Sequence, residues 1–398
     1  MFYPSRMTHF GHSMLEHWAL DPAVIYLNHG TVGAPPRCVL QVQQKLRDEI
    51  ERQPSRFLLQ ELAGIRLGTA NDRQPLLRAA ADEIARFLGA AGKDIVFVDN
   101  ATSGINAVLR TTNFSEGDEL LVLDHTYGGV RNAAEYASRL HGAQVRVVEL
   151  PERNVGPEGV IENVERAIGP RTRFALIDHI TSESALILPV AEIASRCHKH
   201  DVAVLVDGAH APGAIAIDIP SLGVDWYTGN LHKWAWSPRS SGILWTSPRR
   251  QDTLHHTVIS WGLDQGITEE FDWPGTRDPT PHLAAPAGIA FMRDLGTVGV
   301  QRYNHDLAWN AGRAMAAHWG STLPAPEQMI GTMITVPLPE RLGSTREDAF
   351  RVRDALLFEH NIEVHVHAWK GRLRVRVSAQ IYNEMPDVER LIDALAKV

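Results

Sequence analysis

The sequence predicts an α/β protein built on a mostly parallel β-sheet with helices on both faces. The first observation is an alternation of short apolar, β-branched runs with segments of helical periodicity, repeated at least five times. The second is that polar residues follow several predicted strands directly, at the edge where open α/β sheets bind ligands. The third is a change of pattern after residue 280, which predicts a smaller α+β domain. We therefore expect an N-terminal arm over 1–20, a large α/β domain over 21–280 and the small domain over 281–398.

The composition is that of an ordinary globular protein. The chain has 398 residues, of which 44% are apolar and 22% are charged, which is enough for two domains. Its net charge of −8 and the lack of a long basic run argue against a nucleic-acid partner. The two cysteines, Cys38 and Cys197, are too few for a disulfide framework. No apolar run reaches the ~18 residues that a membrane helix needs. The N-terminus lacks a signal-peptide pattern, so we expect a cytoplasmic protein that binds neither membranes nor nucleic acids.

The N-terminal elements lead to a loop rich in glycine and proline. Ile25–Leu27 predicts a short strand, and Asn28–Pro36 follows it as an irregular loop. Such a loop either lines a site or forms a plain turn, and its residues leave both interpretations open. Helical periodicity then covers residues 37–62 and 75–89.

The next strand and helix offer a site for a phosphate. Ile95–Val98 predicts a buried strand, and a turn of small and hydroxyl-bearing residues, Asp99–Gly104, opens a helix. Free N–H groups and the positive end of the helix dipole favour an anion there. Thr102 or Ser103 can also act as a simple N-cap, and this stretch taken alone favours the cap.

Further strands bring aromatic and polar residues to the same edge of the sheet. After the strand Leu120–Leu123, Tyr127 or His125 could supply a flat partner for a cofactor ring. The strand Phe174–Asp178 is again followed by polar residues. The pattern also predicts a strand over 144–150 and a helix over 190–200.

Asp207 and Lys233 give the strongest indication of chemistry. The apolar run Val202–Val206 predicts a buried strand that leads to Asp207, and the short strand Trp226–Thr228 leads towards Lys233. An acid and a lysine brought to one crevice suit pyridoxal 5'-phosphate (PLP). The acid keeps the pyridine nitrogen protonated, and the lysine forms a Schiff base with the aldehyde.

The remainder of the chain predicts an antiparallel return strand and then the small domain. The return strand is Gly242–Trp245, and residues 250–275 are irregular and rich in aromatic residues. The small domain is predicted to contain a helical run over 281–320, strands over 332–336 and 362–366, and a helix over 346–360. Strict alternation in its last strand, Leu373–Ser378, puts Arg374 and Arg376 on one face, either in solvent or as a clamp for a carboxylate.

The motifs of the chain together resemble a known enzyme family. DGAHAPG and HKW around Asp207 and Lys233, NATSGIN around Thr102, GTRD at 275–278 and RVRVSAQIYN around Arg376 are similar to fold-type I PLP enzymes of the class V aminotransferase superfamily. This superfamily includes cysteine desulfurases, kynureninases and isopenicillin N epimerases, and the sequence resembles the epimerases most. The resemblance covers roughly residues 20 to 398. It implies the PLP-dependent transferase fold, with a mostly parallel seven-stranded sheet and a smaller α+β C-terminal domain.

The resemblance also implies the residues of the site. Lys233 is the catalytic lysine, and Thr276 of one subunit completes the phosphate site of its neighbour, which implies a homodimer. The cofactor-binding residues are Ala101, Thr102, Tyr127, Ser182, Asp207, His210, Asn230, His232, Lys233 and Thr276, and the substrate-binding residues are Asn28, His29 and Arg376. We expect no metal, because His198 and His200 fall in a helix-to-strand connection away from the predicted site.

The expected reaction begins at the Cα of a small-molecule amino acid. PLP bound in this way acidifies the Cα–H bond, and Lys233 is then the natural general base. Epimerisation or racemisation is the first hypothesis, and a C–S β-lyase that releases pyruvate and ammonia from a cysteine conjugate or sulfoxide is the alternative. A persulfide relay is disfavoured because the segment His365–Gly371 has no cysteine. We expect His365, His367 and Trp369 at the distal end of the substrate instead.

Overall fold

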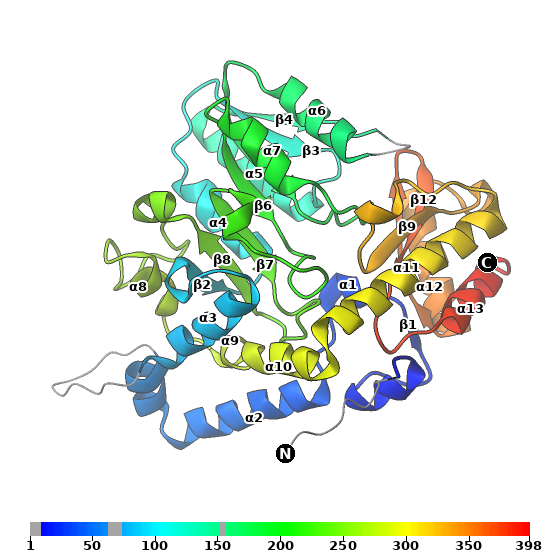
Figure 1. Ribbon diagram of the computed structural model, residues 1–398, viewed down its shortest axis with the longest axis horizontal. Coiled ribbons are helices and arrows are strands. Elements are labelled where there is room, and N and C mark those ends of the chain that lie inside the picture. Colours follow the sequence, from blue (N-terminus) through cyan, green and yellow to red (C-terminus); the bar gives the residue numbers. More distant parts are fainter. Residues whose placement is uncertain (1–8, 63–73, 152–155) are drawn as a thin grey trace.

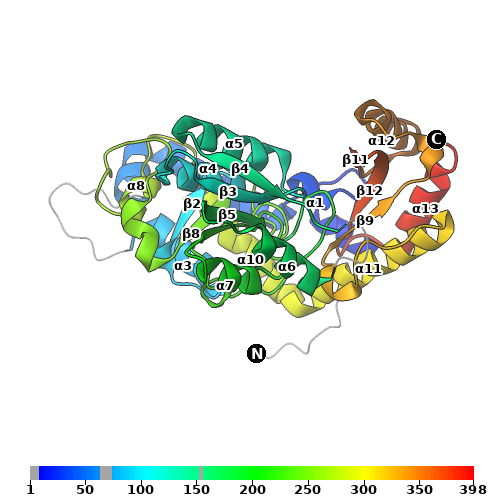
Figure 2. The same cartoon turned by 90° about the horizontal axis from the view of Figure 1, so that it is seen from above.

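The computed structural model describes residues 9–62, 74–151 and 156–398. It consists of a large α/β domain with a smaller α+β domain beside it (Figures 1 and 2). The first eight residues of the predicted arm lie outside the described residues, and its remainder contains a short 3-10 helix over His12–His17. The division of the chain between residues 280 and 281 stays a prediction.

The large domain is organised around one seven-stranded sheet. Its strands lie in the order β2-β8-β7-β6-β5-β3-β4. They are β2 (Ile95–Val98), β3 (Glu119–Leu123), β4 (Gln144–Val148), β5 (Thr172–Asp178), β6 (Ala203–Asp207), β7 (Trp226–Asn230) and β8 (Gly242–Thr246). All neighbours are parallel except at β8, which is antiparallel to both β2 and β7. The predicted sheet and its antiparallel return strand are therefore confirmed.

Helices cover both faces of this sheet. One face packs against α4 (Ala101–Thr111), α5 (Gly128–His141) and α8 (Ile267–Asp272), through residues such as Ile105 and Phe271. The other face packs against α3 (Leu76–Phe87), α6 (Pro157–Ala167), α7 (Val190–His198) and α10 (Ala285–Leu295), through residues such as Ile84 and Ile193. The strands can be apolar at nearly every position because neither face of a covered parallel sheet meets water.

The small domain contains a three-stranded antiparallel sheet. Its order is β11-β12-β9, formed by β11 (His365–Trp369), β12 (Arg372–Ser378) and β9 (Met333–Pro337). The helices α11 (Thr297–Trp319), α12 (Arg346–His360) and α13 (Met385–Leu395) pack with it. The N-terminal segment joins this domain, because β1 (Ile25–Tyr26) pairs in parallel with β10 (Ile362–Glu363).

Two predicted elements are divided in the structure. The helical run expected over 281–320 consists of α9 (Thr280–Leu283), α10 and α11, and Gly296 separates the last two with a φ of 87° that residues other than glycine rarely adopt. The strand expected over 362–366 consists of β10 and β11, which pair with different partners.

The described residues between β1 and α3 form helical segments. These are α1 (His29–Val32), α2 (Arg37–Arg52) and a π-helical stretch over Arg56–Leu62. Among the described residues, no helix is both long enough and apolar enough to span a bilayer. A cytoplasmic location stays a prediction.

Candidate active site

A cavity of about 670 Å³ lies where the large domain meets the small domain. Three neighbouring strands end at it, because Asp178, Asp207 and Asn230 are the last residues of β5, β6 and β7 and all line its wall. The small domain contributes His365 from β11 and Arg376 from β12. The cavity thus occupies the carboxyl-end edge of the sheet, as the sequence analysis expected.

Asp207 forms the floor of the cavity as a buried carboxylate. It is only 3% exposed, and its Oδ1 accepts a hydrogen bond from the backbone N–H of Ala209 at 2.9 Å. Burial raises the pKa of Asp207, while the Ala209 N–H and the charge of Lys233 lower it. Asp178 is its direct neighbour in the β5–β6 pairing, and burial together with the charge of Asp207 raises the pKa of Asp178 well above its ordinary value. Asp207 is therefore an acid that a cationic N–H in the cavity would stabilise.

Lys233 is a buried amine that faces the same cavity. Its Nζ lies 3.2 Å from Nε2 of His210. Burial lowers the pKa of Lys233 to about 7, with a further lowering by the charge of Arg376 and an opposing effect of Asp207. His210 is 2% exposed, and its Nδ1 is buried without a hydrogen bond. At neutral pH much of the lysine is uncharged, which is the form that acts as a nucleophile or a base.

The first turn of α4 brings a helix N-terminus to the cavity wall. Asn100 caps the helix, because its Oδ1 accepts the N–H of Ser103 at 3.0 Å. Asn230, at the end of β7, fixes the same turn by accepting the N–H of Ala101 at 2.7 Å. Thr102 lies between Ala101 and Ser103 in this turn, and it also lines the cavity. The positive end of the helix dipole is thus available to an anionic group.

Arg376 closes the cavity from the small domain. It is 2% exposed; one guanidinium nitrogen donates to the Ser182 carbonyl at 2.7 Å and another donates to Thr31 Oγ1 at 2.9 Å. Its Nε is buried without a hydrogen bond. Its neighbour on the same strand face, Arg374, lies instead over the ring of Trp369, 4.5 Å from the ring centroid. Arg376 is therefore the arginine that can meet a carboxylate in the cavity.

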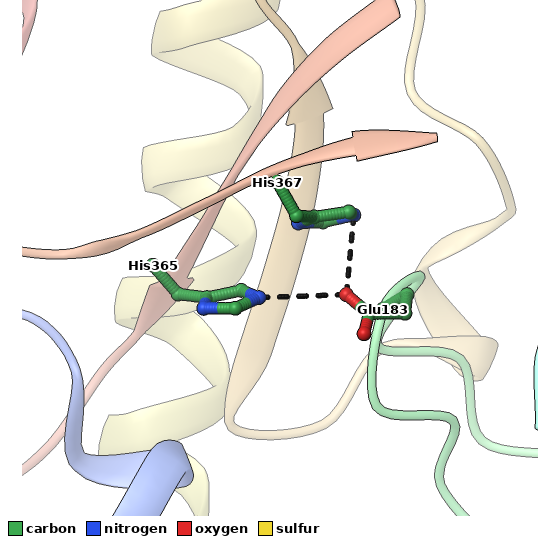
Figure 3. A group of neighbouring side chains, drawn as sticks. All are labelled: Glu183, His365 and His367. Atoms are coloured by element: carbon green, nitrogen blue, oxygen red, sulfur yellow. Dashed lines mark hydrogen bonds and ion pairs between the residues drawn. The ribbon is translucent and has the colours of Figure 1, made fainter. Parts of the chain in front are cut away.

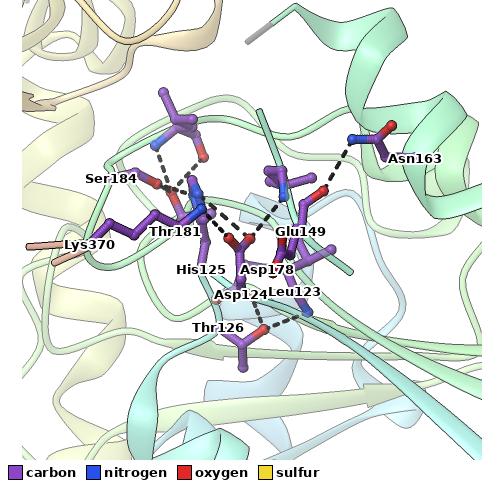
Figure 4. A network of polar contacts seen from close by, with 12 residues as sticks. Leu123, Asp124, His125, Thr126, Glu149, Asn163, Asp178, Thr181, Ser184 and Lys370 are labelled. Atoms are coloured by element: carbon purple, nitrogen blue, oxygen red, sulfur yellow. Dashed lines mark hydrogen bonds and ion pairs between the residues drawn. The ribbon is translucent and has the colours of Figure 1, made fainter. Parts of the chain in front are cut away.

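Of the two aromatic candidates after β3, only Tyr127 lines the cavity. Tyr127 is 47% exposed. His125 is buried in a polar network that Figure 4 shows, where its Nδ1 lies 2.6 Å from Ser184 Oγ. In the same network Lys370 of the small domain forms an ion pair with Asp124 at 2.9 Å, which links the two domains.

The structure brings most of the predicted site residues together. The predicted residues that line the cavity are Ala101, Thr102, Tyr127, Ser182, Asp207, His210, Asn230, His232, Lys233 and Arg376. Thr276 lines a neighbouring hollow of about 250 Å³, which also reaches Ser103 in the first turn of α4. Asn28 and His29 are not part of the cavity wall, whereas the adjacent Gly30 and Thr31 are.

His29 lies behind Lys233. It is fully buried, its Nε2 is 2.9 Å from the Lys233 carbonyl oxygen, and its Nδ1 is 2.9 Å from the Tyr382 hydroxyl. These contacts hold the backbone that carries the lysine. The predicted contacts of Asn28 and His29 with a substrate stay predictions.

Several lining residues were not predicted from the sequence as part of the site, and Asp178 and Glu183 are the most important of them. The polar segment after β5 indicated the region, and Asp178 ends an apolar run as Asp207 does, but no local pattern assigns Asp178 or Glu183 to the site. Their importance follows from neighbours that are distant in sequence, such as Asp207 beside Asp178.

The side chains of the cavity fit PLP. The buried Asp207 carboxylate suits a protonated ring nitrogen, the unbonded His210 Nδ1 offers a polar contact, and the first turn of α4 suits the phosphate. Lys233 supplies the amine that the cofactor aldehyde requires.

Comparisons with known proteins agree with this geometry. The model of the aminotransferase class V family matches residues 68–391. The chain is 32% identical over 404 residues to a probable chloroplastic L-cysteine desulfhydrase of Arabidopsis thaliana, covering 94% of this chain and 83% of that protein. It is 31% identical over 394 residues to isopenicillin N epimerase of Streptomyces clavuligerus, covering 94% and 95%. A solved structure of C-DES with glycine covalently linked to its PLP cofactor matches with a TM-score of 0.75 at 20% identity, covering 94% and 96%. The predicted fold class is thereby confirmed.

Proposed function

The chain belongs to the aminotransferase class V family and is an enzyme with PLP as its cofactor, and from this premise we propose that it cleaves the Cβ–S bond of an α-amino acid. The observation that carries the proposal is the position of Lys233. Its amine is buried beside His210, in the cavity that Asp207 and Arg376 also line.

Each of these residues has a separate task in the proposed reaction. PLP, when bound, withdraws electrons from Cα of the amino acid and so acidifies the Cα–H bond. Arg376 holds the substrate carboxylate, which orients Cα towards the lysine. Asp207 would hold the ring nitrogen of the cofactor in its protonated form. The Nζ of Lys233 accepts the Cα proton, which is favourable because burial lowers the pKa of this amine to about 7.

The proposed elimination needs only this one base. As Lys233 takes the Cα proton, the C–H electron pair forms a double bond between Cα and Cβ, and the Cβ–S pair leaves with the sulfur as a thiolate. Water then releases ammonia and the three carbons of the substrate backbone as pyruvate. No cysteine of this chain takes part, since Cys38 lies on α2 and Cys197 is buried on α7.

Epimerisation is the second candidate, and the similarity to isopenicillin N epimerase over 94% of the chain favours it. It requires a second acid on the face of Cα opposite Lys233. His210 lies on the side of the lysine, and Glu183 is engaged with His365 and His367, 3.4 Å from each. These two residues are therefore poor candidates for the second acid, whereas elimination needs none.

Proton NMR of the enzyme in D₂O, with L-amino acids and cysteine conjugates as substrates, tests the proposal. We expect pyruvate, ammonia and a released thiol. Exchange of the Cα proton with the amino acid left intact, accompanied by the D isomer on chiral analysis, would replace the proposal by epimerisation. The Lys233→Ala variant is the control, and it should produce neither result while also losing the visible absorbance of the lysine-bound cofactor.

We further propose a homodimer in which Thr276 contacts the phosphate bound by the partner. The proposal is supported by the hollow that Thr276 lines, because this hollow reaches Ser103 at the same helix N-terminus that borders the cavity. Because a two-fold interface pairs the same patch of both subunits, a partner docked hollow to hollow would bring its own Thr276 close to the first turn of α4.

A further inference from the structure

Two histidines and a glutamate form a compact cluster between the two domains. His365 and His367 lie two residues apart on β11, so both side chains point to the same side of the strand. Glu183 reaches them from the loop that follows β5 in the large domain. Figure 3 shows both imidazole rings directed at the carboxylate of Glu183.

The distances in this cluster match a metal site better than a set of hydrogen bonds. Nε2 of His365 and Nε2 of His367 each lie 3.4 Å from Oε2 of Glu183. A strong hydrogen bond between such atoms would measure about 2.7–3.2 Å. Zinc bonds of about 2.0–2.1 Å in a tetrahedron place neighbouring ligand atoms about 3.3 Å apart. The three ligand atoms also lie within 4.8 Å of one another.

His367 lacks the partners that a buried histidine normally has. Its side chain is 11% exposed, and both ring nitrogens are buried without a hydrogen bond. Imidazole nitrogens and carboxylate oxygens are common zinc ligands, so the buried ring nitrogens of His367 could be satisfied by a metal ion.

We propose that Glu183, His365 and His367 bind a divalent transition-metal ion, with zinc preferred, and that its fourth coordination position faces the cavity. Two imidazole nitrogens and one carboxylate oxygen form a known type of zinc site with one open position. Ca²⁺ and Mg²⁺ prefer oxygen ligands throughout, so they fit poorly. Glu183 and His365 line the cavity, which supplies the open side.

The location gives the ion two roles. It joins the loop after β5 to β11, and so fixes the small domain against the large one. It also lies next to the carboxylate clamp, because His365 pairs with Arg376 across the β11–β12 ladder. The inference does not depend on whether the bound amino acid is cleaved or epimerised. It departs from the sequence-based expectation of no metal, which rested on other histidines.

Cobalt absorption spectroscopy tests the site directly. Tag-free holoenzyme is dialysed against EDTA, titrated with Co²⁺ and then with Zn²⁺, in the absence of any amino acid. We expect about one equivalent of Co²⁺ with the intense d–d bands of a tetrahedral ion, and zinc should displace it. His367→Ala and Glu183→Gln should weaken binding by more than the roughly 10–100-fold that is lost on mutating an outer partner of a metal ligand.

Two further variants control for folding and for location. His367→Cys keeps a zinc ligand and should retain metal binding, whereas His367→Ala should lose it with PLP content unchanged. A second group of potential ligands consists of His255, Asp264 and Glu270, and His255 already contacts Glu270 at 2.9 Å. The His255→Ala variant should bind cobalt like the unmodified enzyme. Absence of stoichiometric binding, or loss in His255→Ala alone, would overturn the proposal.

Discussion

Gly104 in the first turn of α4 offers a test of how closely the phosphate-binding helix must approach the sheet. A Cβ added at Gly104 would clash with the Thr228 hydroxyl and lie 3.0 Å from Thr228 Cβ on β7. This overpacking should cost about 1–3 kcal/mol, while the higher helix propensity of alanine returns about 1 kcal/mol. At Gly159 on α6, a Cβ added by substitution would have no neighbouring atom within 4 Å. Gly159→Ala therefore gains the higher helix propensity of alanine without a steric clash.

The difference in the free energy of unfolding between the two variants therefore isolates the cost of the steric clash. We expect the Gly104→Ala holoenzyme to be about 1–3 kcal/mol less stable than Gly159→Ala in denaturant unfolding. The clash should also displace the N-terminus of α4 and weaken the bond from Ala101 N–H to Asn230, which is worth about 0.5–1.5 kcal/mol. PLP retention on dialysis should then fall by roughly 2–10-fold. If Gly104→Ala matches Gly159→Ala in both stability and PLP retention, close packing of α4 on β7 does not position the cofactor.

Three further predictions concern single residues. The catalytic rate constant should rise as the pH rises through about 7, because Lys233 is a base only when neutral and burial lowers its pKa to that value; a flat profile across neutral pH would remove the lysine from this role. Asp207→Asn should weaken PLP retention by about 10–100-fold, because a hydrogen bond to a charged group contributes a free energy of that size. Unchanged PLP retention in equilibrium dialysis would contradict the pairing of Asp207 with the ring nitrogen. Thr276→Ala should lower PLP retention while sedimentation still shows a dimer, and an active monomer of the unmodified enzyme would refute the shared site.

The parts of the site that the sequence predicted are those that short segments determine. Asp207 was predicted because an apolar run leads directly into it, whereas the phosphate site was favoured over a simple N-cap only in combination with Asp207, Lys233 and the family resemblance. In a parallel sheet all strand ends of one kind meet at one edge. Correct identification of the strands therefore predicted that Asp207 and Lys233 share one crevice without any knowledge of distances, and both line the cavity.

The sequence was less informative where the role of a residue depends on packing from another domain. His29 follows a strand in a glycine-rich loop, and the family resemblance made it a candidate for substrate contact. In the structure its two ring nitrogens contact the Lys233 carbonyl and the Tyr382 hydroxyl, which lie 204 and 353 residues away in sequence. No local pattern could have indicated these partners.

The same reasoning explains why the cluster of Glu183, His365 and His367 was not foreseen. The spacing of the two histidines on one strand face is visible in the sequence, but a third ligand is needed to distinguish a metal site from two strand histidines. That ligand comes from a loop 182 residues away from His365. Two contacts help to hold the loop near β11: Arg376 binds the Ser182 carbonyl, and Thr335 donates to the Glu183 carbonyl. The residue expected to hold the substrate carboxylate therefore also helps to set the position of Glu183, so a change at Arg376 should disturb metal binding as well as substrate binding.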